Sequence, residues 1–157
     1  MSLFAVNLLL AAAWCALLGV FSLGTLAVGF VLAYLALLVA QPLFGPAPYY
    51  SRVLRLTRLG GYFLRELVIS SVRVAIDVLS PRPTFRPGIV ALPLPEMSDA
   101  GRVTLASLIT LTPGTLSLDF SPDRSTLYVH GMFVDDADAL RRELEKGMER
   151  EVLRALA

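Results

Sequence analysis

Residues 1–51 read MSLFAVNLLLAAAWCALLGVFSLGTLAVGFVLAYLALLVAQPLFGPAPYYS and contain no charged side chain. A helix needs about 20 apolar residues to cross the hydrocarbon core of a bilayer, and residues 2–40 supply nearly twice as many. Small residues gather between positions 19 and 24, where a turn is expected. The sequence therefore predicts a transmembrane helical hairpin over residues 1–41, with spans at 3–20 and 25–41.

The charged residues are segregated along the remainder of the chain. Residues 52–88 carry seven arginines against Glu66 and Asp77, whereas residues 89–157 are mildly acidic, and the net charge is +1. Without a dominant basic face, nucleic acid is not expected as a partner. A basic, proline-rich loop is predicted at 42–59, and the positive-inside rule places it in the cytoplasm.

Residues 60–80 are long enough to form a third membrane helix but carry four charged side chains. The polar members Glu66, Ser70, Arg73 and Asp77 recur every three or four residues and predict one stripe on a helix. In one interpretation the helix lies in the cytoplasmic interface with its stripe toward water. In the other it crosses the bilayer with the stripe against partner subunits, because charges facing lipid are costly. Glu66, Arg73 and Asp77 either pair internally or meet charged helices of partner subunits, and Arg73 and Asp77, four residues apart, can pair on one face.

The segment after residue 80 predicts a linker followed by a small globular domain. Pro81 and Pro83, at the start of the linker 81–88, prevent the helix from continuing. Over 89–157 the pattern predicts a cytoplasmic α+β domain of order β-α-β-β-α, with strands at 89–94, 115–120 and 126–134. A helix capped by Asp99 follows the first strand, and another begins at Asp135 and Asp136 and runs to the end.

The chain shows no sequence signature of an enzyme. Phosphate-binding glycine motifs are absent, the only cysteine is Cys15, and the only histidine, His130, has no predicted acid–base partners. The acids at 135–138 are explained by helix capping, so neither a metal nor a cofactor is expected. The most specific local feature is Thr112-Pro113-Gly114, which predicts a tight bend between a helix and a strand.

These parts, taken in order, resemble a known family. The stretch Leu108-Ile109-Thr110-Leu111-Thr112-Pro113-Gly114-Thr115-Leu116, followed by Leu127-Tyr128-Val129-His130, is similar to the E subunit of the Mrp/Mnh/Pha multisubunit sodium/proton antiporters of bacteria. The similarity extends to the apolar two-helix segment, the arginine-rich connection and the helix that carries Glu66, Arg73 and Asp77.

The resemblance implies a multi-pass subunit of the bacterial plasma membrane, which serves antiport within a complex of other integral membrane subunits. Sodium ions and protons would cross through that complex, because two or three helices cannot enclose a polar route and shield it from lipid. The alternative is a membrane-tethered cytoplasmic adaptor or regulator. The residues expected to be sensitive for subunit contact or coupling are Glu66, Arg73, Asp77, Thr112, Pro113 and Gly114.

Overall fold

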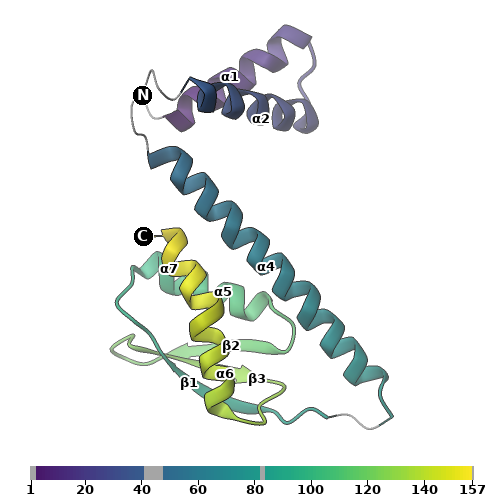
Figure 1. Ribbon diagram of the computed structural model, residues 1–157, viewed down its shortest axis with the longest axis vertical. Coiled ribbons are helices and arrows are strands. Elements are labelled where there is room, and N and C mark those ends of the chain that lie inside the picture. The colour runs from purple at the N-terminus through teal and green to yellow at the C-terminus, as the bar shows by residue number, and fades with distance from the viewer. Residues whose placement is uncertain (1–2, 41–47, 82–83, 157) are drawn as a thin grey trace. The chain divides into compact units, whose positions relative to one another are not determined.

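The computed structural model describes residues 3–40, 48–81 and 84–156, which form two compact units that divide after Leu54. The N-terminal unit contains helices α1 (Leu3–Leu18) and α2 (Leu23–Val39) and the first residues of α4 (Pro48–Leu79). The C-terminal unit contains the remainder of α4 and a small α+β fold (Figure 1).

Helices α1 and α2 form the predicted helical hairpin. Helix α1 ends two residues earlier than expected, and α2 has the expected length but begins and ends two residues earlier. Gly19, with a φ of +66°, ends α1, and Ser22 caps α2 by accepting a hydrogen bond from the Thr25 amide at 3.1 Å. Asn7 is fully buried and donates to the Tyr49 hydroxyl at 2.7 Å. Within the described ranges, no helix is both long and apolar enough to be a candidate membrane span.

Helix α4 is longer than the segment predicted at 60–80. It begins at Pro48, so residues 48–59, which the sequence predicts as a loop, are helical, whereas residues 41–47 lie outside the described part. No proline follows until Pro81, and Gly60 and Gly61 occupy open positions on the helix. The glycine pair therefore weakens the helix locally without ending it.

The C-terminal fold has the predicted order β-α-β-β-α. Strand β1 (Gly88–Pro93) leads to α5 (Asp99–Leu111), and β2 (Thr115–Phe120) is followed by β3 (Thr126–Gly131). The three strands form an antiparallel sheet of order β1-β3-β2. Ser98 rather than Asp99 caps α5, because its hydroxyl accepts from the Gly101 amide at 3.2 Å.

A bulge in β2 changes the face to which its apolar residues belong. The alternation predicts Leu116, Leu118 and Phe120 on one face, but the register shifts between Ser117 and Asp119. Leu116 and Leu118 are exposed, whereas Phe120 packs against the core. That expectation was wrong because the extra residue of a bulge reverses the order of faces beyond it.

The last helical segment consists of α6 (Ala137–Leu144), a π-helical turn at Glu145–Glu149 and α7 (Arg150–Leu156). A strict four-residue stripe predicts Leu156 in the core, but Ala155 is buried instead and Leu156 is 42% exposed. The reason is the 3.6-residue period, which places i+7 rather than i+8 on the buried face. The core lies between the sheet, α5 and α7, and Leu59 of α4 belongs to it.

Candidate functional site

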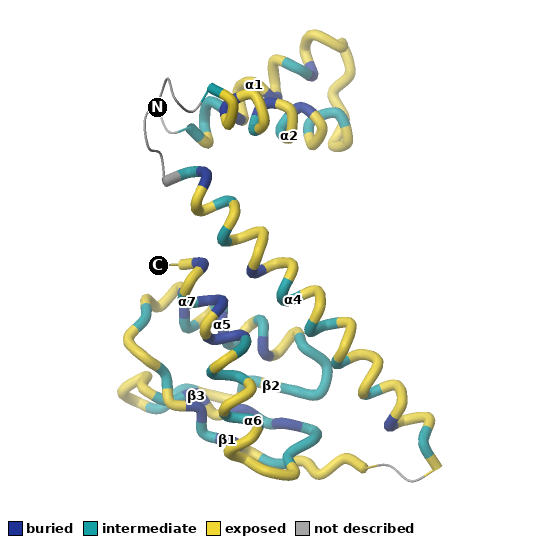
Figure 2. The backbone as a smooth tube through the Cα atoms, in the orientation of Figure 1, coloured by how far each residue is buried: buried dark blue, intermediate teal, exposed yellow. Residues whose placement is uncertain are grey.

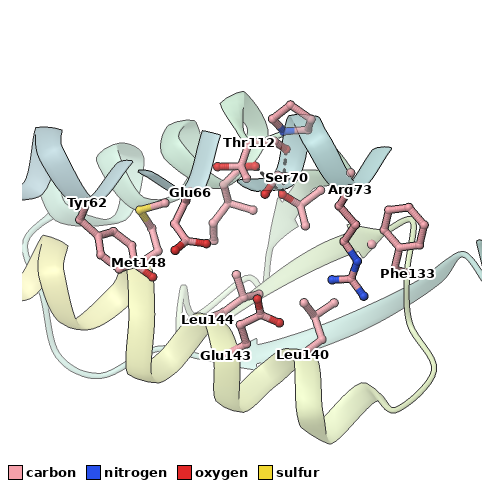
Figure 3. A pocket seen from close by; sticks show the side chains of 15 residues that line it. Tyr62, Glu66, Ser70, Arg73, Thr112, Phe133, Leu140, Glu143, Leu144 and Met148 are labelled. Atoms are coloured by element: carbon pink, nitrogen blue, oxygen red, sulfur yellow. Dashed lines mark hydrogen bonds between the residues drawn. The ribbon is translucent and has the colours of Figure 1, made fainter. Parts of the chain in front are cut away.

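The site that gathers most of the predicted residues is a cavity of about 80 Å³ between α4 and the α+β fold. Its volume is enough for several water molecules. Glu66 and Arg73 enter it from α4, and the bend after α5 contributes Thr112, Pro113 and Gly114 (Figure 3). The polar stripe of α4 thus faces the protein's own C-terminal fold, an arrangement that neither interpretation of residues 60–80 includes.

The bend is shaped by hydroxyl groups and one glycine. Thr112 donates from its hydroxyl to the Leu108 carbonyl at 2.8 Å, and Thr115 donates to the Ile109 carbonyl at 2.7 Å. These bonds satisfy carbonyls at the end of α5 that lack a partner within the helix. Gly114 has a φ of +90° and its carbonyl accepts from the Met132 amide at 2.8 Å, so the bend is also joined to the residues after β3.

Arg73 does not pair with Asp77 among the described residues. Its guanidinium carbon lies 4.8 Å from the centre of the Phe133 ring, a cation–π arrangement that joins α4 to the loop after β3. Asp77 is buried and accepts from the Thr84 amide at 2.7 Å and the Thr84 hydroxyl at 2.8 Å. Asp77 therefore holds the connection after α4, and it borders a neighbouring hollow rather than the cavity.

The cavity combines carboxylates with hydroxyls and apolar walls. Glu66 forms an ion pair with Arg65 at 2.7 Å, and Glu143 of α6 lies across the cavity from α4. Desolvation raises the pKa of Tyr62, and the nearby Glu66 charge adds to the shift. Among the described lining residues there is no histidine or cysteine. The carboxylates and hydroxyls form a polar joint between α4 and the α+β fold.

Several residues of this region were not predicted from the sequence. Gly147 lies in the π-helical turn, where an added Cβ would collide with the Tyr62 hydroxyl of α4. A π-helical turn brings adjacent residues to the buried side, and both Met148 and Glu149 are buried here. Tyr62 and Gly147 come into contact only in the tertiary structure, so the local sequence pattern does not predict their contact.

Glu149 is the most perturbed acid of the C-terminal unit. The residue is 8% exposed, and its Oε2 has no hydrogen-bond partner among the described residues. Burial raises its pKa from 4.5 to about 7, and the charge of Glu145 adds to the shift. The ionised form is thus disfavoured in the folded protein.

This pKa predicts a stability effect with a definite sign. Between pH 4.5 and 7 the folded chain binds more protons at Glu149 than the unfolded chain, so the free energy of unfolding falls as pH rises through this window. Above pH 7 the penalty is on the order of 2 kcal/mol. We expect Glu149→Gln to raise the melting temperature at pH 8 by about 4 °C and to change little at pH 4.5.

Circular dichroism of the full chain in detergent, recorded at both pH values, measures this difference. Glu96→Gln is the matched control, because Glu96 is exposed and loses the same charge. Parallel pH profiles for wild type and Glu149→Gln would contradict the assignment.

Comparisons with known proteins cover nearly the whole chain. The model of a family described as Na+/H+ ion antiporter subunit matches residues 7–155. The E subunit of the Na(+)/H(+) antiporter of Alkalihalophilus pseudofirmus is 33% identical over 94% of this chain and 93% of its own length. The corresponding E subunit of Bacillus subtilis is 34% identical over 93% of this chain and 92% of its own length.

Two solved structures are also similar. A chain of the Mrp complex from Dietzia sp. DQ12-45-1b has a TM-score of 0.51 and 34% identity, covering 66% of this chain and 97% of that one. A chain of the membrane-bound sulfane sulfur reductase, an archaeal respiratory membrane complex, has a TM-score of 0.58 and 26% identity over 100% of both chains. From these matches, the chain belongs to the family of Na+/H+ ion antiporter subunits, as an E-type subunit.

Proposed function

We propose that this protein is an accessory membrane subunit of a multisubunit sodium/proton antiporter, needed for assembly and antiport rather than as a transporter by itself. Its partners are the other integral membrane subunits, and sodium ions and protons pass through the complex as a whole. Similarity to E-type antiporter subunits over almost the full length supports this role. Likeness to a chain of a respiratory complex supports a module that serves a larger membrane assembly.

The observation that carries the proposal is the division of α4 into two faces. One face places Tyr62, Glu66 and Arg73 at the cavity. The other is an apolar stripe at helical spacing, whose members are 51% to 83% exposed. Figure 2 shows exposed stretches that recur along α4. Such a stripe marks a contact with apolar surroundings, here lipid and the helices of partner subunits. Its members are Leu64, Val68, Val72, Ile76 and Leu79.

The hairpin of α1 and α2 is proposed to lie in the bilayer, with the C-terminal domain in the cytoplasm and the chain multi-pass. Residues 1–51 contain no charge, and large apolar side chains of both helices are exposed. Helices of 16 and 17 residues measure about 24 and 26 Å, near the lower limit for the hydrocarbon core. The arginines after residue 51 support the cytoplasmic side.

We further propose that Glu66, Arg73, Asp77, Thr112, Pro113 and Gly114 are functionally sensitive because they hold α4 on the C-terminal domain. Five of the six line one cavity, and Asp77 holds the connection that follows α4. Disturbing this joint would turn the apolar stripe of α4 away from its partners.

Val72→Glu tests the proposal because Val72 is 51% exposed in the middle of the stripe. A carboxylate there should leave the C-terminal fold intact and prevent docking, since burying an unpaired charge at an interface is costly. We expect co-purification with the other antiporter subunits to fall at least tenfold. Sodium-dependent collapse of a pH gradient in inverted membrane vesicles should fall with it.

Val103→Glu is the matched control, because Val103 is 62% exposed on α5, away from the stripe. It should assemble and support antiport like wild type. Full assembly and antiport by Val72→Glu would overturn the proposal.

The adaptor function remains the second candidate, supported by the independent core of the C-terminal unit. Deleting residues 89–157 separates the two functions. Loss of the complex or of antiport supports the accessory role, whereas intact transport with altered regulation supports the adaptor.

A further inference from the structure

Three arginines converge around an open hollow of about 410 Å³ at the end of α7. Arg55 and Arg58 come from α4, and Glu151 and Arg154 come from α7. Each helix supplies residues three apart, which therefore lie on one helical face. The hollow lies wholly within the C-terminal unit.

Glu151 organises two of the three guanidinium groups. Its carboxylate lies 3.0 Å from Arg58 Nε and 2.9 Å from Arg154 Nη1, and its side chain is only 7% exposed. The side chains of Arg58 and Arg154 are 62% and 46% exposed, so both remain accessible beyond this ion pair. One carboxylate against three guanidinium groups leaves an excess of two positive charges.

Arg55 has no role in this ion-pair cluster. Its Nε is buried and has no hydrogen-bond partner among the described residues. A buried donor of a charged group is costly unless an acceptor satisfies it. The hollow thus combines excess positive charge, exposed guanidinium groups and an unsatisfied donor, which together indicate an anionic ligand.

We propose that this hollow binds the phosphate of an anionic phospholipid headgroup. Guanidinium groups match phosphate oxygens in paired hydrogen bonds, and basic clusters beside a membrane segment attract anionic lipid. Arg55 follows directly after the unit that holds the uncharged hairpin, and the exposed apolar stripe of α4 begins at Leu64. Apolar surface on the same helix favours a lipid headgroup, whose acyl chains it can contact, over free phosphate.

The inference rests on the membrane association proposed above and is independent of antiport. Its test is native mass spectrometry of the full chain in detergent, titrated with phosphatidylglycerol or with phosphatidylcholine of the same acyl chains. We expect phosphatidylglycerol to bind at least fivefold more tightly. Arg154→Gln and, separately, Arg55→Gln should each weaken its binding about fivefold.

Both variants are chosen so that folding is preserved. Arg154→Gln leaves Glu151 paired with Arg58. Arg55→Gln breaks no hydrogen bond of Nε, because Arg55 Nε has no partner among the described residues. Arg150→Gln is the control, because Arg150 is exposed on α7 outside the hollow and loses the same charge. Circular dichroism verifies that the three variants are folded.

Inorganic phosphate provides the remaining arm of the experiment. Millimolar phosphate should displace phosphatidylglycerol only weakly if the acyl chains contribute to binding. Displacement by phosphate as effective as that by the lipid itself would overturn the lipid assignment. Equal binding of the two lipids, or equal loss in Arg150→Gln and Arg154→Gln, would overturn the site itself. These results need no partner subunit, so they are distinguishable from a failure of Val72→Glu to affect antiport.

Discussion

Gly29→Leu should prevent α1 from packing against α2 and remove the protein from membranes. A Cβ at Gly29 would lie 2.9 Å from Trp14 Cδ1, 3.0 Å from Trp14 Cβ and 3.1 Å from the Ala11 carbonyl oxygen. The Ala11 oxygen is a backbone atom and the Trp14 Cβ is attached directly to the backbone, so neither can move aside without separating the helices. Close approach of membrane helices depends on small residues at such crossings, and the expected cost is about 3 kcal/mol.

The steady-state amount of the chain in membranes, measured by immunoblotting, tests this expectation. Gly24→Leu is the matched control, because the nearest atom to its Cβ position is Ser22 Oγ at 3.8 Å. We expect Gly24→Leu to accumulate like wild type and Gly29→Leu to be nearly absent. Equal amounts of both variants would show that the helices do not pack at Gly29.

Gly114→Val should destabilise the bend that forms one wall of the cavity. With a φ of +90°, Gly114 adopts a backbone conformation in which a β-branched residue is strongly strained. The expected cost is about 2 to 3 kcal/mol. Because the Gly114 carbonyl also accepts from Met132, moving it disturbs the loop that carries Phe133 and, with it, the stacking of Arg73. Antiport should fall together with stability.

Urea unfolding of the full chain in detergent, followed by circular dichroism, measures the loss. Gly61→Ala serves as the control, because nothing lies within 4 Å of its Cβ position and it belongs to the interior of α4. We expect this change to stabilise the chain by about 0.5 to 1 kcal/mol. If Gly114→Val unfolds at the same urea concentration as wild type, the bend does not require a residue with a positive φ at position 114.

Local patterns predicted the α+β fold well where a single period governs an element. The alternation and turn residues of the C-terminal domain indicated three strands and two helical segments, which the structure confirms. The bend at Thr112-Pro113-Gly114 also lies where its composition placed it. Such features depend on backbone sterics and hydrogen bonds among neighbours in the chain, so the sequence contains the necessary information.

The environment of the polar stripe on α4 could not be predicted in the same way. Helical spacing placed Glu66, Arg73 and Asp77 on one face, but it did not identify what they contact. Arg73 stacks on Phe133 from the loop after β3, and Asp77 accepts from Thr84 in the connection that follows α4. Arg73 and Asp77 do not pair in the described part of the chain, because each contacts one of these two residues instead. Periodicity identifies a face without identifying what it contacts.

The sequence by itself determined that a charge-free segment of 51 residues is joined to a basic stretch, an amphipathic helix and a small α+β domain, because charge, prolines and periods of two and 3.6 are local properties. Only the tertiary structure decided that α4 turns its polar stripe inward and leaves an apolar stripe outside. It also decided that Glu151 gathers two arginines beside a third. These arrangements depend on contacts between residues far apart in the chain, whose energies appear only when the whole core packs.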